Sequence, residues 1–103
     1  MLYNVTVSVD PSIESDWVQW MQNVHIPAVL QTKCFIKCVL SKVHGNEVGE
    51  CTFSVLYWAV SKADFDQYIA VHAPALQREH TTRYDGKFVA FRTTMDLIDE
   101  LIA

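Results

Sequence analysis

Residues 25–28 read His-Ile-Pro-Ala, and residues 72–75, forty-seven positions later, read His-Ala-Pro-Ala. Each copy lies at the end of a helical pattern that follows a strand pattern. The same offset also pairs apolar positions around the motif: Val18 with Phe65, Met21 with Tyr68, Val24 with Val71, and Val29 with Leu76. The sequence therefore predicts one strand-helix-strand unit used twice, and the repeat describes architecture rather than a reaction.

Four segments have the patterns of β-strands. Residues 3–9 alternate apolar and polar side chains, which is typical of a strand with one buried face. Residues 34–43 and 51–60 are rich in β-branched and aromatic side chains, and the turn-like segment between them predicts a hairpin. Residues 87–95 alternate again after an Asp-Gly turn.

Two helical segments lie between these strands. Asp10 is placed to cap the first, and apolar residues at helical spacing carry it to His25. Ser61 and Asp64 resemble a capping box at the start of the second. Proline disfavours a helical conformation in the residue before it, so Pro27 is expected to kink or end the first helix. The second helix is expected to resume after a similar kink.

The order β-α-β-β-α-β with a repeated half is that of the α+β ferredoxin-like fold. We expect residues 1–103 to form a single domain with a four-stranded antiparallel sheet and both helices on one of its faces. Asp96 is a suitable cap for a further short helix at the C-terminus. Its apolar side would carry Leu97, Ile98, Leu101 and Ile102.

Whether the apolar positions of each strand have odd or even residue numbers limits the pairing expected in the hairpin. The apolar face is even-numbered in its first strand and odd-numbered in its second, so paired residue numbers must sum to an odd number. A sum near 93 places Cys38 opposite Val55. Ile36 then also faces the helices, and the bend lies near Asn46 and Glu47.

The sheet face away from the helices is expected to mix polar and apolar side chains. Its predicted members are Asn4, Thr6, Ser8, Phe35, Lys37, Val39, Ser41, Thr52, Ser54, Leu56, Trp58, Phe88, Ala90 and Arg92. This open face is too apolar to lie bare in water, and closed homodimers are the commonest assemblies. We therefore expect a second copy of the chain to cover it. The predicted dimer face comprises Val39, Leu56, Trp58, Phe88 and Arg92.

Composition excludes several classes of partner. The net charge is -4, from 12 acidic and 8 basic residues, and no basic stripe suits a nucleic-acid backbone. The longest apolar stretch, around residues 53–60, is far shorter than the ~20 residues of a spanning helix, and no signal peptide is recognisable. We expect a cytoplasmic protein that binds neither nucleic acid nor membrane.

The three cysteines are expected to be reduced. Cys34 and Cys38 are four residues apart in one predicted strand, which separates them by about 13 Å, too far for a disulfide. With Cys51 the count is odd, and no CxxC spacing occurs. We interpret them as small buried side chains on the helix-covered face.

Three runs resemble a small bacterial family of uncharacterised domains of ~100 residues. They are Trp17-x-x-Trp20-Met21-x-x-x-His25-x-Pro27, Tyr68-x-x-x-His72-Ala73-Pro74 with Leu76-x-x-Glu79-His80, and Gly-Lys-Phe-Val-Ala-Phe-Arg-Thr at 86–93. That family is similar in turn to the dimeric α+β barrel proteins, which pack two open sheet faces together and often hold a pocket between helices and sheet. The wider group includes cofactor-free monooxygenases, small decarboxylating or isomerising enzymes, and haem proteins. The resemblance implies a fold and a dimer but no particular reaction.

The repeated histidines are the first candidate site residues. His25 and His72 continue apolar helical stripes, so both should face inward. Each imidazole could satisfy carbonyls at a helix end, or could line a pocket as acid, base or ligand. Trp20 and Tyr57 are candidate ligand contacts beside them, although such aromatics are more often core. Catalytic residues remain unassigned.

A metal or cofactor is not expected. His80 follows Glu79 but faces differently on a helix, and no HxxxH spacing occurs. No haem signature or nucleophile elbow is present. Arg92 beside Trp58 could bind a carboxylate or pair across a dimer. Two hypotheses remain: a homodimer that binds or transforms a small, partly apolar molecule between helices and sheet, and a non-catalytic dimerisation module.

Overall fold

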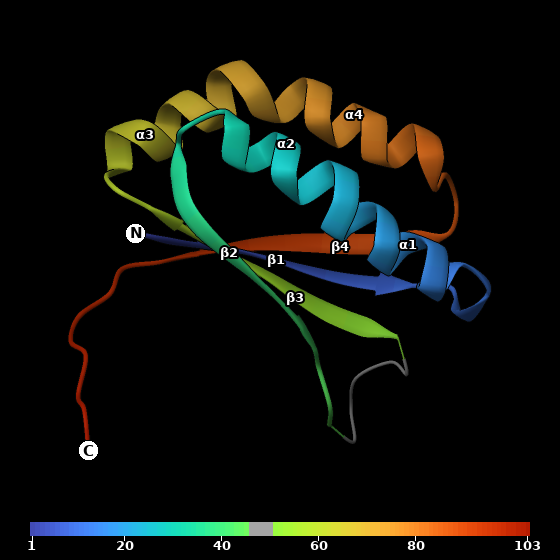
Figure 1. Ribbon diagram of the computed structural model, residues 1–103, viewed down its shortest axis with the longest axis horizontal. Helices are drawn as coiled ribbons and strands as arrows, with labels where there is room; N and C mark the ends of the chain where they lie inside the picture. Colours follow the sequence, from blue (N-terminus) through green and yellow to red (C-terminus); the bar gives the residue numbers. More distant parts are fainter. Residues whose placement is uncertain (46–50) are drawn as a thin grey trace.

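The computed structural model describes residues 1–45 and 51–103, which form one four-stranded antiparallel sheet with helices over one of its faces (Figure 1). The strand order is β2-β3-β1-β4. The strands are β1 (Leu2–Val9), β2 (Phe35–Lys42), β3 (Thr52–Ala59) and β4 (Phe88–Met95). The helical segments are η1 (Pro11–Ile13), α1 (Glu14–Trp20), η2 (Met21–His25), α2 (Ile26–Gln31), α3 (Lys62–Gln67), η3 (Tyr68–His72) and α4 (Ala73–Arg83). This is the ferredoxin-like α+β fold predicted from the element order.

Both predicted caps are confirmed, but neither proline ends its helix. Asp10 accepts a hydrogen bond from the backbone of Ser12, and Ser61 accepts one from Asp64. In each half the helix passes into the motif through a π-helical turn, η2 or η3. Pro27 and Pro74 then lie in the first turn of α2 and α4.

The π turns explain why the helices continue. The backbone N–H of Ile26 bonds to the carbonyl of Met21, and that of Ala73 to the carbonyl of Tyr68, both five residues back. A proline in a regular α-helix lacks one N–H and collides with the carbonyl four residues earlier. A wider turn just before the proline displaces that carbonyl. The repeated motif therefore encodes a π turn.

The hairpin strands β2 and β3 have the predicted parity but not the predicted register. Cys38 pairs with Tyr57 rather than Val55, so the register differs by two residues. A β-bulge between Phe35 and Lys37 reverses the alternation at the start of β2. Phe35 is therefore buried under the helices and Ile36 is exposed, the opposite of the prediction. The bend predicted at residues 46–47 lies outside the described residues.

Strand β4 presents the face opposite to the predicted one. Phe88, Ala90 and Arg92 lie opposite inward-facing residues of β1 and face the helices, so their predicted place on the open face is wrong. Val89 and Phe91 take their place and are 70% and 64% exposed. The sequence around them is apolar on both faces, so the alternation could not decide between them.

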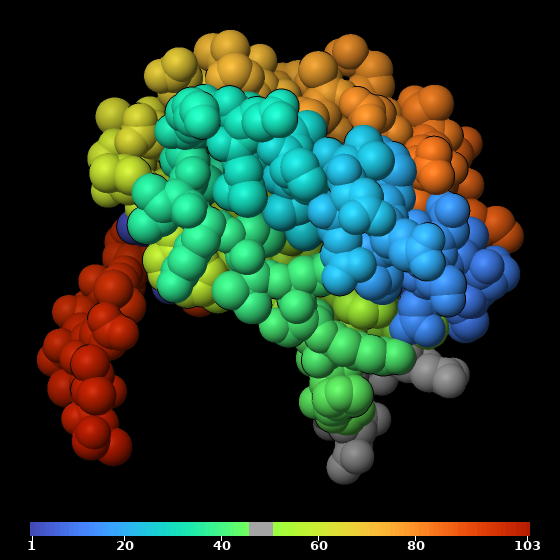
Figure 2. All heavy atoms as spheres, viewed as in Figure 1, coloured from blue at the N-terminus to red at the C-terminus, as the bar shows by residue number. Residues whose placement is uncertain are grey.

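The predicted C-terminal helix does not form. Residues 96–103 have no helical structure, their apolar side chains are exposed, and the segment leaves the body of the protein (Figures 1 and 2). A helix of two turns is not stable without tertiary contacts, and no part of the described sheet or helices covers this one.

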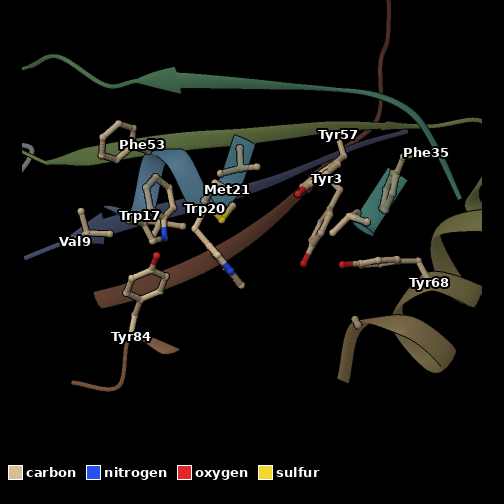
Figure 3. Packing of buried hydrophobic residues seen from close by; sticks show 14 of the residues in the cluster. Tyr3, Val9, Trp17, Trp20, Met21, Phe35, Phe53, Tyr57, Tyr68 and Tyr84 are labelled. Atoms are coloured by element: carbon tan, nitrogen blue, oxygen red, sulfur yellow. The ribbon is translucent and has the colours of Figure 1, made fainter. Parts of the chain in front are cut away.

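The core contains two groups of aromatic side chains (Figure 3). Trp17 is fully buried, its ring centroid lies 4.9 Å from that of Phe53, and Tyr84 lies nearby. The second group gathers under η3 and comprises Tyr3, Phe35, Tyr57 and Tyr68.

The cysteines also belong to this interior. Cys34 and Cys51 are buried and Cys38 is half-buried. Burial raises the pKa of the Cys38 thiol to about 11. This thiol is therefore protonated and a poor nucleophile at neutral pH.

Candidate functional site

A cavity lies between the helices and the sheet, bounded on one side by Tyr3, Tyr57 and Tyr68 of the second aromatic group. About 40 Å³ of it is open to the centres of water molecules, whereas one water needs roughly 10–15 Å³. Its floor is apolar and comes from three strands: Val5, Val7, Val55, Phe88 and Ala90. Its walls and roof carry polar groups from η2, η3, α4 and β4.

His80 is the most deeply set of these polar groups. It lies on α4, is 9% exposed, and its Nε2 accepts a 2.8 Å hydrogen bond from the indole Nε1 of Trp17. Because Nε2 is the acceptor, a neutral ring carries its proton on Nδ1. The His80 ring also meets Phe88 edge-on, with centroids 4.4 Å apart. The imidazole is thus held in one orientation and one tautomer.

His25 approaches the same space from η2. Its ring centroid lies 5.8 Å from that of His80 and 5.1 Å from that of Trp20. Its Nδ1 is buried and has no hydrogen-bond partner among the residues that the structure describes. Such an atom costs free energy unless a water or ligand satisfies it.

Both histidines are neutral at pH 7. Burial, and to a lesser extent the nearby guanidinium of Arg92, lowers the pKa of His25 from 6.5 to about 4. Burial, His25 and Arg92 together lower the pKa of His80 to about 4. Each neutral ring can therefore accept one hydrogen bond and donate another to a ligand.

Arg92 alone carries a formal charge among the described residues that line the cavity. It lies on β4, is exposed to solvent, and therefore marks the mouth of the cavity. Its guanidinium is within hydrogen-bonding reach of the Tyr3 hydroxyl. Burial raises the pKa of Tyr3, and Arg92 opposes that shift without reversing it, so the hydroxyl keeps its proton at neutral pH.

The predicted ligand contacts fall in different places. His25 and Tyr57 line the cavity. Trp20 packs behind His25 and borders a separate surface hollow beside Arg83. His72 is half-buried, stacks on Tyr68 at 6.5 Å, and does not line the cavity.

Sequence reasoning missed the contribution of α4. Gln77 and His80 line the cavity, and the buried residues Ala73, His80 and Tyr84 share their side of the helix. Their spacing of three and four residues is that of a helix face turned to the core. That spacing could have identified Gln77 and His80 from the sequence. The charged residues between these positions obscured it.

Residues 1–45 and 51–103, the described parts of the chain, lack two further features. Nowhere there do three or more histidine, cysteine or acidic side chains gather as metal ligands. None of the helices in those ranges combines the length and the apolar character that crossing a membrane requires.

Solved structures share this fold across nearly the whole chain. A dimeric ferredoxin-like protein from an uncultured marine organism has a TM-score of 0.69 and 16% identity, covering 99% of this chain and 98% of its own. HapK from Hahella chejuensis has a TM-score of 0.68 and 12% identity, covering 100% and 99%. The monooxygenase ActVA-Orf6 of Streptomyces coelicolor, solved in complex with the ligand Nanaomycin D, has a TM-score of 0.57 and 17% identity, covering 98% and 91%. At these identities the likeness concerns the fold alone.

A family assignment comes from the sequence itself. No curated protein matches the chain. Residues 1–98, nearly the whole chain, match a family whose description is Domain of unknown function (DUF4286). This protein therefore belongs to the DUF4286 family, and its structural neighbours are dimeric ferredoxin-like and monooxygenase-like proteins.

Proposed function

We propose that the protein is a homodimer that binds, or transforms, a small and partly apolar molecule in the cavity between helices and sheet. The observation that carries the proposal is the buried, unpartnered Nδ1 of His25 beside the neutral ring of His80. A largely apolar pocket with a few convergent polar groups is the usual form of a small-molecule site. The proposal also draws on the neighbour ActVA-Orf6, a monooxygenase solved with an organic ligand.

The two histidines can hydrogen-bond a ligand, and either neutral ring can act as a weak general base. His80 presents Nδ1–H because Trp17 occupies Nε2, and a neutral His25 can accept or donate. Their low pKa values keep both rings in the neutral form at pH 7. An enolisation is one such step: His25 would take up the proton, and the Nδ1–H of His80 would donate a hydrogen bond to the enolate oxygen.

A screen of small organic fragments tests the proposal. Trp17 donates its indole N–H to a cavity histidine, whereas Trp58 lies on the opposite face of the sheet, so the two indole NMR signals report the site and the background. We expect hits that shift the Trp17 signal and leave the Trp58 signal in place. A screen of several hundred fragments at millimolar concentration without such a hit would favour the non-catalytic dimerisation module, which the small size of the cavity also suits.

The homodimer is proposed from the open face. Val39, Leu56 and Trp58 remain there as predicted, and Val89 and Phe91 join them in place of Phe88 and Arg92. Val39 is 44% exposed, and Val89 and Phe91 more so. An apolar patch made of these five side chains is larger than monomeric proteins usually expose to water. Solved neighbours that are described as dimeric support the same arrangement.

The dimer is tested by placing a charge on that face. Trp58→Glu should give monomer or aggregate in light scattering at micromolar concentration, because a carboxylate buried in an apolar interface costs several kcal/mol, roughly as for other unpaired buried charges. Val71→Glu is the control, since Val71 is an exposed apolar residue on the helical side. A wild-type protein that is monomeric at this concentration would refute the dimer. As part of the same proposal we place the protein in a bacterial cytoplasm, where buried thiols such as Cys34 stay reduced.

A further inference from the structure

We propose that the ligand of this cavity is a small organic carboxylate, held at the mouth by Arg92 while its apolar body enters between helices and sheet. The inference rests on the proposed function and names the substrate class of the same site. Three properties of the cavity carry it: its charge, its hydrogen-bonding groups and its floor.

The charge of the lining is purely positive. Arg92 lines the cavity, and no aspartate or glutamate does so within the described residues. The ion pairs found in residues 1–45 and 51–103 join other residues: Lys42 with Glu14, Lys62 with Asp66, and Arg83 with Asp16. The Arg92 guanidinium therefore faces the cavity mouth without a carboxylate from this part of the chain. Its planar fork matches a carboxylate with two parallel hydrogen bonds.

The neutral polar groups of the lining can donate to the same anion. The Tyr3 hydroxyl lies beside Arg92 and retains its proton. His80 keeps Nδ1–H because Trp17 occupies Nε2. The amide of Gln77 adds two further N–H groups from α4. A ligand with acceptor oxygens satisfies such a lining better than a neutral donor does.

The floor fits the rest of the ligand. Beyond Arg92 the sheet offers Val5, Val7, Val55 and Ala90, with no polar side chain on those positions. An aromatic or short aliphatic body buries apolar surface there, whereas a polyanion such as a nucleotide would leave charged oxygens on the valines. The combination of one cation at the mouth and an apolar floor selects a monoanion.

Benzoate and benzamide test the inference, because they share a ring and nearly a shape but differ in charge. Titration of the wild-type full chain is followed at the indole N–H signals of Trp17 and Trp58 at pH 7. We expect benzoate to shift the Trp17 signal and to bind with a Kd at least about tenfold lower than that of benzamide. Benzoate binding should also weaken with added NaCl, and benzamide binding should not.

Two variants locate the charge. Arg92→Gln should remove the preference for benzoate and its salt dependence. Arg78→Gln makes the same charge change on the exposed side of α4 and should keep both. If Arg92→Gln fails to fold, the wild-type ratio of the two Kd values and its salt dependence decide the matter alone.

The outcomes separate this inference from the proposed function. Equal binding of benzoate and benzamide at the Trp17 signal overturns the anion preference while leaving a ligand site. A benzoate effect on Trp58 instead of Trp17, or no benzoate effect where uncharged fragments bind, also overturns it. If neither these compounds nor any fragment of the screen moves the Trp17 signal, the proposed function fails as well.

Discussion

The two copies of the repeated motif have the same backbone and different surroundings. Each begins at the last residue of a π turn, and each places its proline at the start of an α-helix. Yet His25 lies at the cavity with a buried, unpartnered Nδ1, while His72 is half-exposed and only stacks on Tyr68. The repeat therefore specifies how the chain turns, and it leaves open what the histidine does.

The difference arises from the helix that follows each motif. α2 ends after six residues, whereas α4 continues for eleven and carries Gln77 and His80 over the sheet. At the forty-seven-residue offset the counterpart of His80 is Lys33, which lies beyond the end of α2 with a φ of 66°. Figure 1 shows the longer helix passing across the sheet above β4. One half supplies His25, the other supplies His80, and neither half alone makes the site.

Acidification should produce the largest change in stability that separates the two copies of the motif. The pKa values of His25 and His80 are about 4 in the folded protein and 6.5 in the unfolded chain, so the unfolded chain binds more protons between these values. The contribution of the two neutral rings to the free energy of unfolding is therefore fully present above about pH 6.5 and is lost as the pH falls towards 4. From pH 7 to pH 5 we expect a loss of about 3–4 kcal/mol in the free energy of unfolding, measured by urea denaturation at fixed protein concentration.

Single variants assign that loss to one half. His25→Leu should reduce it by about half, because one of the two titrating rings is gone. His72→Leu is the control, because that ring is half-exposed and does not line the cavity. The carboxyls of Asp10 and Glu14 have pKa values lowered by hydrogen bonds to Ser12 and Lys42, so they contribute below this pH window. An equal reduction by both histidine variants would contradict the distinction between the two copies.

At constant pH 7 the same two variants should also differ in stability. His25→Leu removes a buried nitrogen that has no partner and should raise the free energy of unfolding by about 1 kcal/mol. His72→Leu changes a half-exposed ring and should stay within about 0.5 kcal/mol of wild type. The urea midpoint reports both. Destabilisation by His25→Leu would mean that an ordered water or a ligand already satisfies Nδ1.

The smallest effect concerns the end of the shorter helix. Lys33 has a left-handed backbone conformation, which costs a non-glycine residue free energy. Lys33→Gly should raise the free energy of unfolding by about 0.5 kcal/mol, after the greater flexibility of glycine in the unfolded chain is subtracted. Gln31→Gly, inside the last turn of α2, is the control and should lower it by a similar or larger amount. A loss of stability with Lys33→Gly would show that this conformation does not set the end of α2.

The strands and helices were predictable because their signals are local. Asp10 and Ser61 cap the helices where expected, and the alternation in residues 3–9 gave the inward face of β1 correctly. The inward face of β4 was not predictable, because Phe88 and Phe91 are both apolar and only pairing with β1 decides between them. The β-bulge after Phe35 likewise depends on pairing between β2 and β3. Residues 96–103 form no helix because they lack contacts with the described sheet and helices.

By itself the sequence determined the order of elements, the internal repeat, the family and the candidacy of His25. These depend on short-range periodicity, capping and motif spacing, which each segment carries without its neighbours. Only the tertiary structure decided that Arg92 and His80 join His25 while His72 does not. A cavity is made of side chains that are far apart in the chain, and their meeting depends on strand pairing, on helix length and on which face each strand turns inward. A one-residue shift in strand register moves a side chain to the other side of the sheet, and a shorter α4 would not carry His80 to the cavity, so no local pattern could have fixed the site.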